Sequence, residues 1–130
     1  MKAVRAYIFL SAMIRTVLYT LELMTMRLQR AGLGNLTQSN REYVNQYTAC
    51  EGKDTDECVW GLIRSAQSSV AEVCVVPLQD YLCLGNEARM NMPSTLGDNW
   101  KWRLTRGQFT DEIIQRIYAM TRLYGRIQEQ

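Results

Sequence analysis

Apolar side chains recur every three or four residues in three long stretches of the chain, and this spacing predicts amphipathic helices. The first stretch covers residues 3–30, the second covers residues 55–69, and the third follows Thr110. The first half of residues 3–30 is apolar nearly all round, which indicates a helix that is buried or that lacks its partner. The predicted buried faces comprise Val17, Leu18, Leu21, Met24 and Leu28 in the first helix, Val59, Leu62, Ile63, Ala66 and Val70 in the second, and Ile113, Ile114, Ile117, Tyr118, Thr121 and Tyr124 in the third.

The region between the first two helices is polar and rich in turn-forming residues. Gly32 and Gly34 are expected to end the first helix, because glycine commonly follows a helix end. Residues 35–40 then form a predicted polar linker, and residues 41–47 a short helix. A loop is predicted over residues 48–56. One face of the short helix would carry Tyr43, Val44 and Tyr47.

Capping residues support the starts of the second and third helices. Asp54 with Glu57 three residues later resembles a capping box, with Asp in place of Ser or Thr. Thr110 is expected to cap the third helix. The acidic residues lie in the first turn of this helix and the basic ones near its end, an order that suits the helix dipole. These charged residues are Asp111, Glu112, Arg122 and Arg126.

A valine-rich segment over residues 72–78 is too short for a helix and predicts the one strand of the chain. Pro77 lacks a backbone donor, so strand pairing is expected to end there. A helical turn is predicted within residues 78–85, and residues 86–107 show no periodicity, as in a long functional loop. The fold class is therefore mainly α with one strand. One strand cannot make a sheet, so its unpaired edges predict missing neighbours or self-association.

Composition limits the classes of function. A length of 130 residues suits one domain, whereas a complete (β/α)8 barrel needs about 250 residues. The formal net charge of +2 is too small to indicate nucleic acid or an acidic membrane as a partner. An apolar run over residues 6–14 resembles a short signal peptide, but a plain helix is the favoured interpretation. That run is also too short to cross a bilayer, so no stable membrane span is predicted.

The chain has four cysteines and no histidine. The cysteines form no C-x-x-C pair, and we expect four unpaired thiols in a reducing cytoplasm. A zinc site would need cysteine-only ligands at unusual spacing, so no zinc site is predicted. Without histidine, the usual Ser-His-Asp and Cys-His catalytic arrangements are excluded. The four cysteines are Cys50, Cys58, Cys74 and Cys83.

The long loop carries residue types that bind sugars. Amide side chains both donate and accept hydrogen bonds, as sugar hydroxyls require, and arginine adds charge-assisted donors. Indole rings offer flat apolar faces that match the C–H face of glucose. The alternative is that both tryptophans belong to the core and that Arg89 pairs with Glu87 or Asp98. The candidate substrate-binding residues are Gln79, Arg89, Asn91, Asn99, Trp100 and Trp102.

Two other functions remain open at this stage. Glycosyl transfer by a retaining enzyme needs two carboxyl groups about 5 Å apart, and the loop offers only Asp80, Glu87 and Asp98. Each has a structural alternative as a cap or a charge partner, so no catalytic residue is assigned.

The second function is partner binding through the N-terminal helix, in which methionines could form a groove or an interfacial anchor. These are Met13, Met24 and Met26, for which a core role is the alternative.

Several motifs, in order and spacing, resemble the C-terminal end of the amylomaltases, the bacterial 4-alpha-glucanotransferases. The resemblance covers roughly residues 40–126. Its parts are Arg64-Ser65-Ala66, Ser68-Ser69, Pro77-Leu78-Gln79-Asp80, Leu84-Gly85, Glu87-Ala88-Arg89-Met90-Asn91, Pro93, Asn99-Trp100, Trp102-Arg103 and Leu123-Tyr124-Gly125-Arg126.

This resemblance implies a TIM-barrel enzyme that transfers α-1,4-glucan segments between maltooligosaccharides and uses no cofactor. Residues 73–78 would be the last barrel strand, Asn91 part of the glucan-binding rim, and residues 99–103 its scaffold. The family's catalytic carboxylates lie upstream of the matched motifs, one of them in a Thr-His-Asp-Asn motif that this histidine-free chain lacks. Ser94 and Cys83 stand where glycine is usual.

The sequence therefore predicts an unmatched helical segment over residues 1–35 and the C-terminal portion of a glucanotransferase barrel over residues 36–130. We expect a cytoplasmic, truncated and non-catalytic chain whose partner is an α-1,4-glucan. The alternative is a non-enzymatic helical interaction protein or a glucan-binding module.

Overall fold

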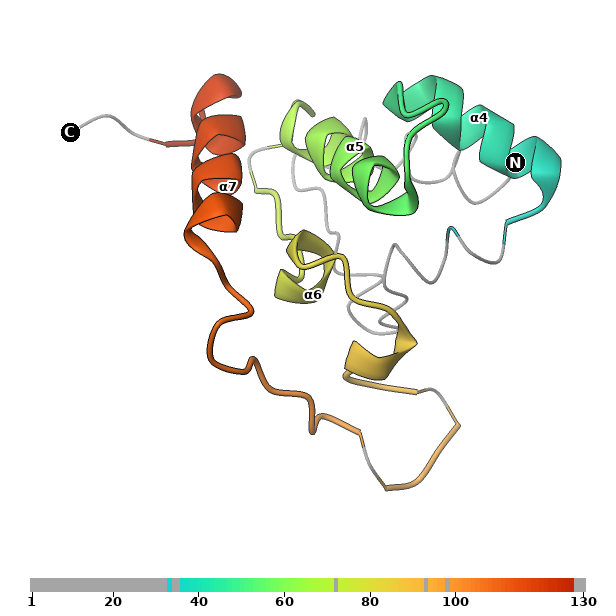
Figure 1. Cartoon of the computed structure of the whole chain (residues 1–130), viewed down its shortest axis with the longest axis vertical. Helices are drawn as coiled ribbons and strands as arrows, with labels where there is room; N and C mark the ends of the chain where they lie inside the picture. Colours follow the sequence, from blue (N-terminus) through green and yellow to red (C-terminus); the bar gives the residue numbers. More distant parts are fainter. Residues whose placement is uncertain (1–32, 34–35, 72, 93, 98, 128–130) are drawn as a thin grey trace.

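The computed structural model describes residues 33, 36–71, 73–92, 94–97 and 99–127. Its elements are α4 (Gln38–Thr48), α5 (Thr55–Gln67), α6 (Leu78–Tyr81), the 3-10 helix η1 (Asn86–Ala88) and α7 (Asp111–Leu123), arranged as in Figure 1. The predicted helix over residues 3–30 and the glycines expected to end it lie outside the described residues. None of the described helices is long and apolar enough to cross a membrane.

Helix α4 is longer than the short helix predicted at this place. It begins at Gln38 because the side chain of Thr37 accepts a hydrogen bond from the backbone N–H of Asn40, at 3.4 Å. The second half of the predicted linker is therefore helical. Val44 is buried as expected, but Tyr43 and Tyr47 are about half exposed and stack on each other outside the core.

Helix α5 lies at the centre of the helical layer and confirms the predicted periodicity. Asp54 caps it by accepting a 2.8 Å hydrogen bond from the backbone N–H of Glu57. Val59 and Ile63 are fully buried, and each contributes about 1.5–3 kcal/mol by leaving water. Val70 was wrongly placed in this face: it is 87% exposed, because the helix ends at Gln67.

The core forms where α4, α6 and α7 meet α5 (Figure 1). Trp60, missed in the sequence pattern, is 5% exposed, and its ring centroid lies 5.6 Å from that of Tyr81. The indole therefore fills the space between α5 and α6. The buried cluster consists of Leu33, Val44, Cys50, Cys58, Val59, Trp60, Ile63 and Cys83.

Two of the four cysteines form a disulfide, so the expectation of four free thiols was wrong. The loop between α4 and α5 reverses the chain and brings Cys50 to a Cα–Cα distance of 5.3 Å from Cys58. Both side chains are buried. The spacing of eight residues carried no signal of this pairing, because the turn that creates it is set by the packing of the two helices. Cys74 and Cys83 form no disulfide within the described part of the chain.

The predicted strand over residues 72–78 does not form as an element. Among the described residues of this segment only Cys74 makes a single β-bridge, and α6 begins directly after Pro77. Val73 and Val75 are 50% and 42% exposed, so the segment is not buried on both faces. Valine favours strands only where neighbouring strands pack against it, and none of the described residues supplies one. The described part of the fold is therefore helical.

Helix α7 packs on α5 and confirms the predicted cap and charge order. The side chain of Thr110 accepts a hydrogen bond from the N–H of Ile113 at 3.4 Å. The predicted buried face is correct only in part, because Ile117 packs against the core whereas Tyr118 is 51% exposed. Arg126, expected near the end of α7, instead donates hydrogen bonds to the carbonyl oxygens of Gln67, the last residue of α5, and of Ser69 just beyond it.

Candidate functional site

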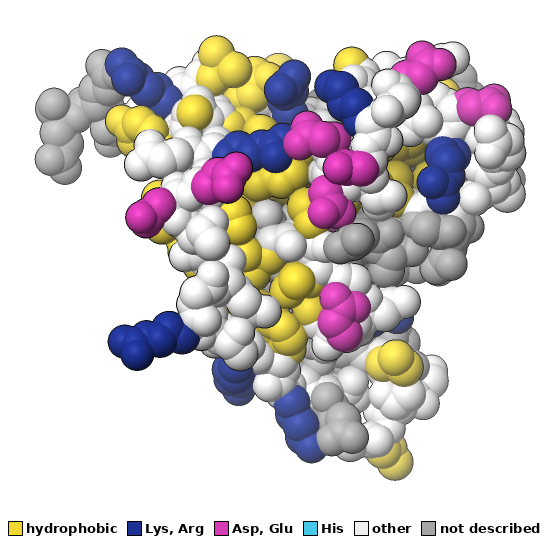
Figure 2. All heavy atoms as spheres, viewed as in Figure 1, with side chains coloured by type: hydrophobic (Ala, Val, Ile, Leu, Met, Phe, Trp, Pro, Cys, Tyr) yellow, Lys and Arg dark blue, Asp and Glu magenta, His cyan; other side chains and the backbone are white. Residues whose placement is uncertain are grey.

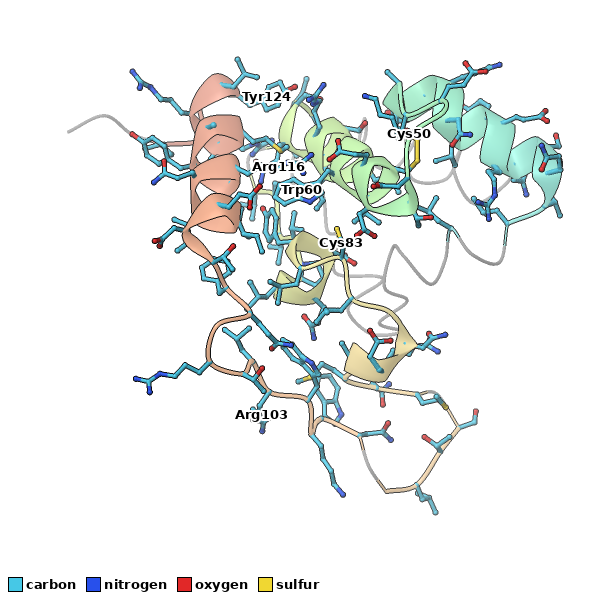
Figure 3. All side chains as sticks on the ribbon, viewed as in Figure 1. Cys50, Trp60, Cys83, Arg103, Arg116 and Tyr124 are labelled. Carbon is cyan, nitrogen blue, oxygen red and sulfur yellow. A yellow bond between two sulfur atoms is a disulfide. The ribbon has the colours of Figure 1, made fainter. Side chains whose placement is uncertain are left out.

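An open cleft of about 560 Å³ lies where α6 meets the long loop that leads to α7. It includes three of the six candidate substrate-binding residues: Gln79, Trp100 and Trp102. The loop region containing Arg103 lies below α6 in Figure 3. The full lining consists of Pro77, Gln79, Met90, Trp100, Trp102, Arg103 and Leu104.

Gln79 anchors the floor of the cleft. It lies in the first turn of α6 and is 5% exposed. Its side-chain N–H group donates to the backbone carbonyl oxygen of Ala88, 3.4 Å away, and so ties α6 to η1. A buried amide must be hydrogen-bonded to be tolerated, and this bond also holds its orientation.

Trp100 presents its indole at the edge of the cleft. The side chain is 55% exposed, and the backbone has a φ of 64°, a left-handed conformation that costs a residue with a side chain roughly 1–2 kcal/mol. The N–H of Trp100 donates to the carbonyl oxygen of Met90, which joins the two sides of the loop. Trp102 is half-buried and lines the same cleft.

Arg103, which sequence reasoning placed only in the scaffold of the loop, organises both tryptophans. Its Nη1 atom donates to the carbonyl oxygens of Trp100 at 2.8 Å and Trp102 at 2.7 Å. Charge-assisted bonds of this length are strong, so the guanidinium offsets the strained backbone of Trp100. Arg103 also lines the cleft itself. The only signal for it in the sequence was its place after Trp-x-Trp.

Asn99 stabilises the tip of the loop. Its Oδ1 atom accepts from the N–H of Met92 at 2.8 Å, and its Nδ2 atom donates to the backbone carbonyl and hydroxyl oxygens of Thr95, both at 3.3 Å. Its amide is thus engaged within the loop, and it does not line the described cleft. This geometry is that of a scaffold residue, and direct contact of Asn99 with a substrate stays a prediction.

Arg89 and Asn91 flank Met90, whose side chain lines the cleft. Both are half-buried and make interactions within the chain. The structure thus brings Gln79, Trp100 and Trp102 together and places Arg89 and Asn91 beside them in the chain.

Neither Asp80 nor Glu87 lines the cleft. Asp80 is 2% exposed, and Glu87 accepts a 2.7 Å hydrogen bond from the N–H of Gly85. Asp98 lies outside the described residues. In Figure 2 most acidic side chains lie over the helical layer, whereas the loop below presents mainly basic and uncharged ones.

Two ionisable groups near α6 have shifted pKa values. Burial raises the pKa of the Cys74 thiol, with an opposing effect of Arg126. Burial also raises the pKa of Tyr81, whose hydroxyl oxygen accepts a hydrogen bond from Gln67 at 3.2 Å. Both groups are therefore protonated at neutral pH, and Cys74 is not an activated nucleophile. Within the described ranges no group of three or more His, Cys, Asp or Glu residues could hold a metal ion.

Comparison of the chain with known proteins shows which family it belongs to. A family model described as 4-alpha-glucanotransferase matches residues 15–110, most of the chain. The chain belongs to the 4-alpha-glucanotransferase family. This match starts inside the segment over residues 1–35 that the motifs left unmatched, and the division of the chain at residue 36 stays a prediction.

Curated relatives support the assignment. The chain is 54% identical over 67 residues to the 4-alpha-glucanotransferase of Clostridium butyricum, a match covering 52% of this chain and 14% of the relative. It is 38% identical over 94 residues to the enzyme of the same name from Streptococcus pneumoniae, covering 72% of this chain and 18% of the relative. The chain thus spans less than a fifth of the length of these relatives.

A solved structure shows the same fold. The structure of an amylomaltase from Streptococcus agalactiae in complex with acarbose has a TM-score of 0.69 with this chain, at 24% sequence identity. The match covers 75% of this chain and 19% of the amylomaltase chain. At this identity the likeness establishes the fold of the matched part.

Proposed function

We propose that this chain supplies a glucan-contacting loop of a 4-alpha-glucanotransferase, and that the cleft beside Trp100 and Trp102 holds an α-1,4-linked glucose chain. The observation that carries this proposal is the arrangement of two indoles beside Gln79 and Arg103 around one open cleft. The indole faces provide apolar contact for sugar rings, and the amide and guanidinium groups provide polar partners for hydroxyls. Family membership supports the choice of an α-1,4-glucan over other sugars.

We further propose that the 130-residue chain alone does not transfer glucan. A retaining glycosyl transfer needs two carboxyl groups about 5 Å apart at the substrate. Asp80 is buried, and Glu87 is bonded to its own turn. Neither lines the cleft. The purified chain is therefore expected to release no glucose from maltotriose, and measurable release would contradict the proposal.

The binding proposal is tested by titrating the ¹⁵N-labelled chain with maltoheptaose. We expect shifts at the indole N–H groups of Trp100 and Trp102 and at the side-chain amide of Gln79, with smaller changes at Arg89 and Asn91. Trp100→Ala should weaken binding about tenfold, as truncation of an aromatic anchor commonly does.

The matched control is Leu96→Ala, which removes a fully exposed apolar side chain from the same loop without touching the cleft. This variant should bind as the unmodified chain does. Equal weakening in both variants, or shifts spread evenly over the helices, would argue against the cleft.

A second candidate function is assembly through exposed apolar residues. Val73 and Val75 leave apolar surface beside the bridge residue Cys74, and Tyr118 does so on α7. Self-association through this surface would give a solution mass above the 15.0 kDa of the monomer in light scattering. Replacing both valines by threonine should then restore the monomer while leaving maltoheptaose binding intact. A monomeric unmodified chain would reject this candidate.

A further inference from the structure

A second cleft, of about 280 Å³, lies between α5, α7 and the loop that follows α4. It shares no lining residue with the cleft at Trp100. Figure 3 shows two of its lining residues, Trp60 and Arg116, between α5 and α7. Nothing in the proposed glucan site uses this second cleft.

The charges that line this cleft are mostly positive. Three cations, Lys53, Arg64 and Arg116, face one carboxylate, that of Glu57. The Nη2 atom of Arg116 lies 2.9 and 3.0 Å from the two carboxylate oxygens of Glu57, so these two charges neutralise each other. Among the described residues Lys53 and Arg64 have no ion-pair or hydrogen-bond partner for their side chains. The cleft is therefore lined by two positively charged side chains that no carboxylate of the described residues neutralises.

A cation–π contact and a disulfide hold the walls of the cleft in place. The guanidinium carbon of Arg116 lies 4.1 Å from the ring centroid of Trp60, a cation–π contact on a buried indole. Lys53 belongs to the loop closed by the Cys50–Cys58 disulfide, and its N–H donates to the carbonyl oxygen of Cys50 at 3.0 Å. Such restraints lower the entropy that a ligand must remove.

Asp54, the acidic residue next to Lys53 in the chain, makes a hydrogen bond outside the cleft. The carboxylate of Asp54 accepts the N–H of Glu57 at the start of α5 and does not line the cleft. The remaining wall is formed by uncharged side chains of α7, namely Ala119, Met120 and Leu123. One side of the cleft is thus cationic and the other is apolar.

We propose that this cleft binds a small anion that carries a phosphate group. Arginine presents planar donors that match phosphate oxygens, and lysine adds a point charge. The volume is near the lower end of small-molecule pockets and leaves room for a small organic part against the apolar wall. The phosphate group has two possible sources, inorganic phosphate and the phosphate monoester of a small molecule.

The test is a set of titrations of the full ¹⁵N-labelled chain at constant ionic strength. The probes are sodium phosphate and glucose 6-phosphate, with sodium chloride and glucose as matched controls. We expect both phosphates to shift the backbone signals of Gly61, Arg64 and Ala119, and neither control to do so. Tighter binding of glucose 6-phosphate assigns the site to a phosphate monoester, and equal binding assigns it to inorganic phosphate.

Variants separate the site from general charge attraction. Arg64→Gln should weaken phosphate binding about tenfold, through loss of a charge-assisted hydrogen bond. Arg106→Gln removes the same charge from the exposed loop before α7 and should leave binding unchanged. Lys53 lies in a surface loop, so Lys53→Gln should fold even if Arg64→Gln does not. It should likewise weaken phosphate binding.

Three results would overturn the proposal. The first is equal shifts with chloride, and the second is equal binding of glucose and glucose 6-phosphate. The third is equal weakening by Arg64→Gln and Arg106→Gln. The glucan cleft shares no lining residue with this cleft. The effect of Trp100→Ala on maltoheptaose binding therefore tests the glucan proposal separately from the phosphate proposal.

Discussion

The helical layer and the long loop of this chain are stabilised in different ways. In the layer, fully buried apolar side chains such as Val59 and Ile63 hold α5 against its neighbours. The loop is instead stabilised by hydrogen bonds. Arg103 donates to the carbonyl oxygens of Trp100 and Trp102, and Asn99 accepts from the N–H of Met92 at the loop tip. The loop can therefore keep its aromatic side chains exposed at a cleft, whereas the layer buries its own indole.

The largest expected effect comes from breaking the layer. Ile63→Ala removes a side chain with no exposed surface and should lower the free energy of unfolding by about 4 kcal/mol, within the range for such truncations. Urea denaturation followed by circular dichroism measures this loss. Leu96→Ala on the loop is the control and should change stability by less than about 0.5 kcal/mol. Equal losses in the two variants would mean that the layer is not the stabilising region.

The disulfide is the next largest contribution to the layer. Cys50→Ser with Cys58→Ser should lower the free energy of unfolding by about 2.5 kcal/mol, the loop-closure value for eight residues. Cys74→Ser is the control, because this cysteine is free. The same measurement with and without a reductant reports whether the bond forms. A cytoplasmic location, which stays a prediction, would keep it largely reduced.

Arg103→Gln tests the loop without touching the layer. It should weaken maltoheptaose binding about tenfold, because Trp100 can then relax from a backbone conformation that costs roughly 1–2 kcal/mol. Arg103→Lys keeps the charge but loses the planar arrangement of donors. Its affinity for maltoheptaose should lie between those of the unmodified chain and Arg103→Gln. NMR titration gives the affinity, and urea denaturation should show little change. Weaker binding that is matched by lost stability would contradict a positioning role.

The smallest expected effect is at the contact between α5 and α7. Glu57→Gln removes an ion pair whose side chains are 42% and 41% exposed, so the loss should be about 0.5 kcal/mol and should shrink in high salt. Thermal unfolding at low and high salt measures it. A loss that did not depend on salt would show that Glu57 acts through packing.

The sequence pattern predicted the helical layer well and the site only in part. Asp54, Thr110 and the α5 periodicity are local signals, and each is confirmed. The predicted strand failed because β structure depends on neighbours that a local pattern does not reveal. The Cys50–Cys58 bond and the role of Arg103 depend on how the chain turns back on itself, so spacing alone could not locate them.

Two of the contacts that join α5 to the C-terminal region show the relative direction of α5 and α7. Glu57 pairs with Arg116 and Gln67 with Arg126, and both pairs are separated by 59 residues. A constant separation means that α7 runs the same way as α5, so the intervening chain must travel back along the full length of the helix. That return path carries the tryptophan loop. Shortening it would move the cleft and also prevent α7 from reaching its starting point beside α5.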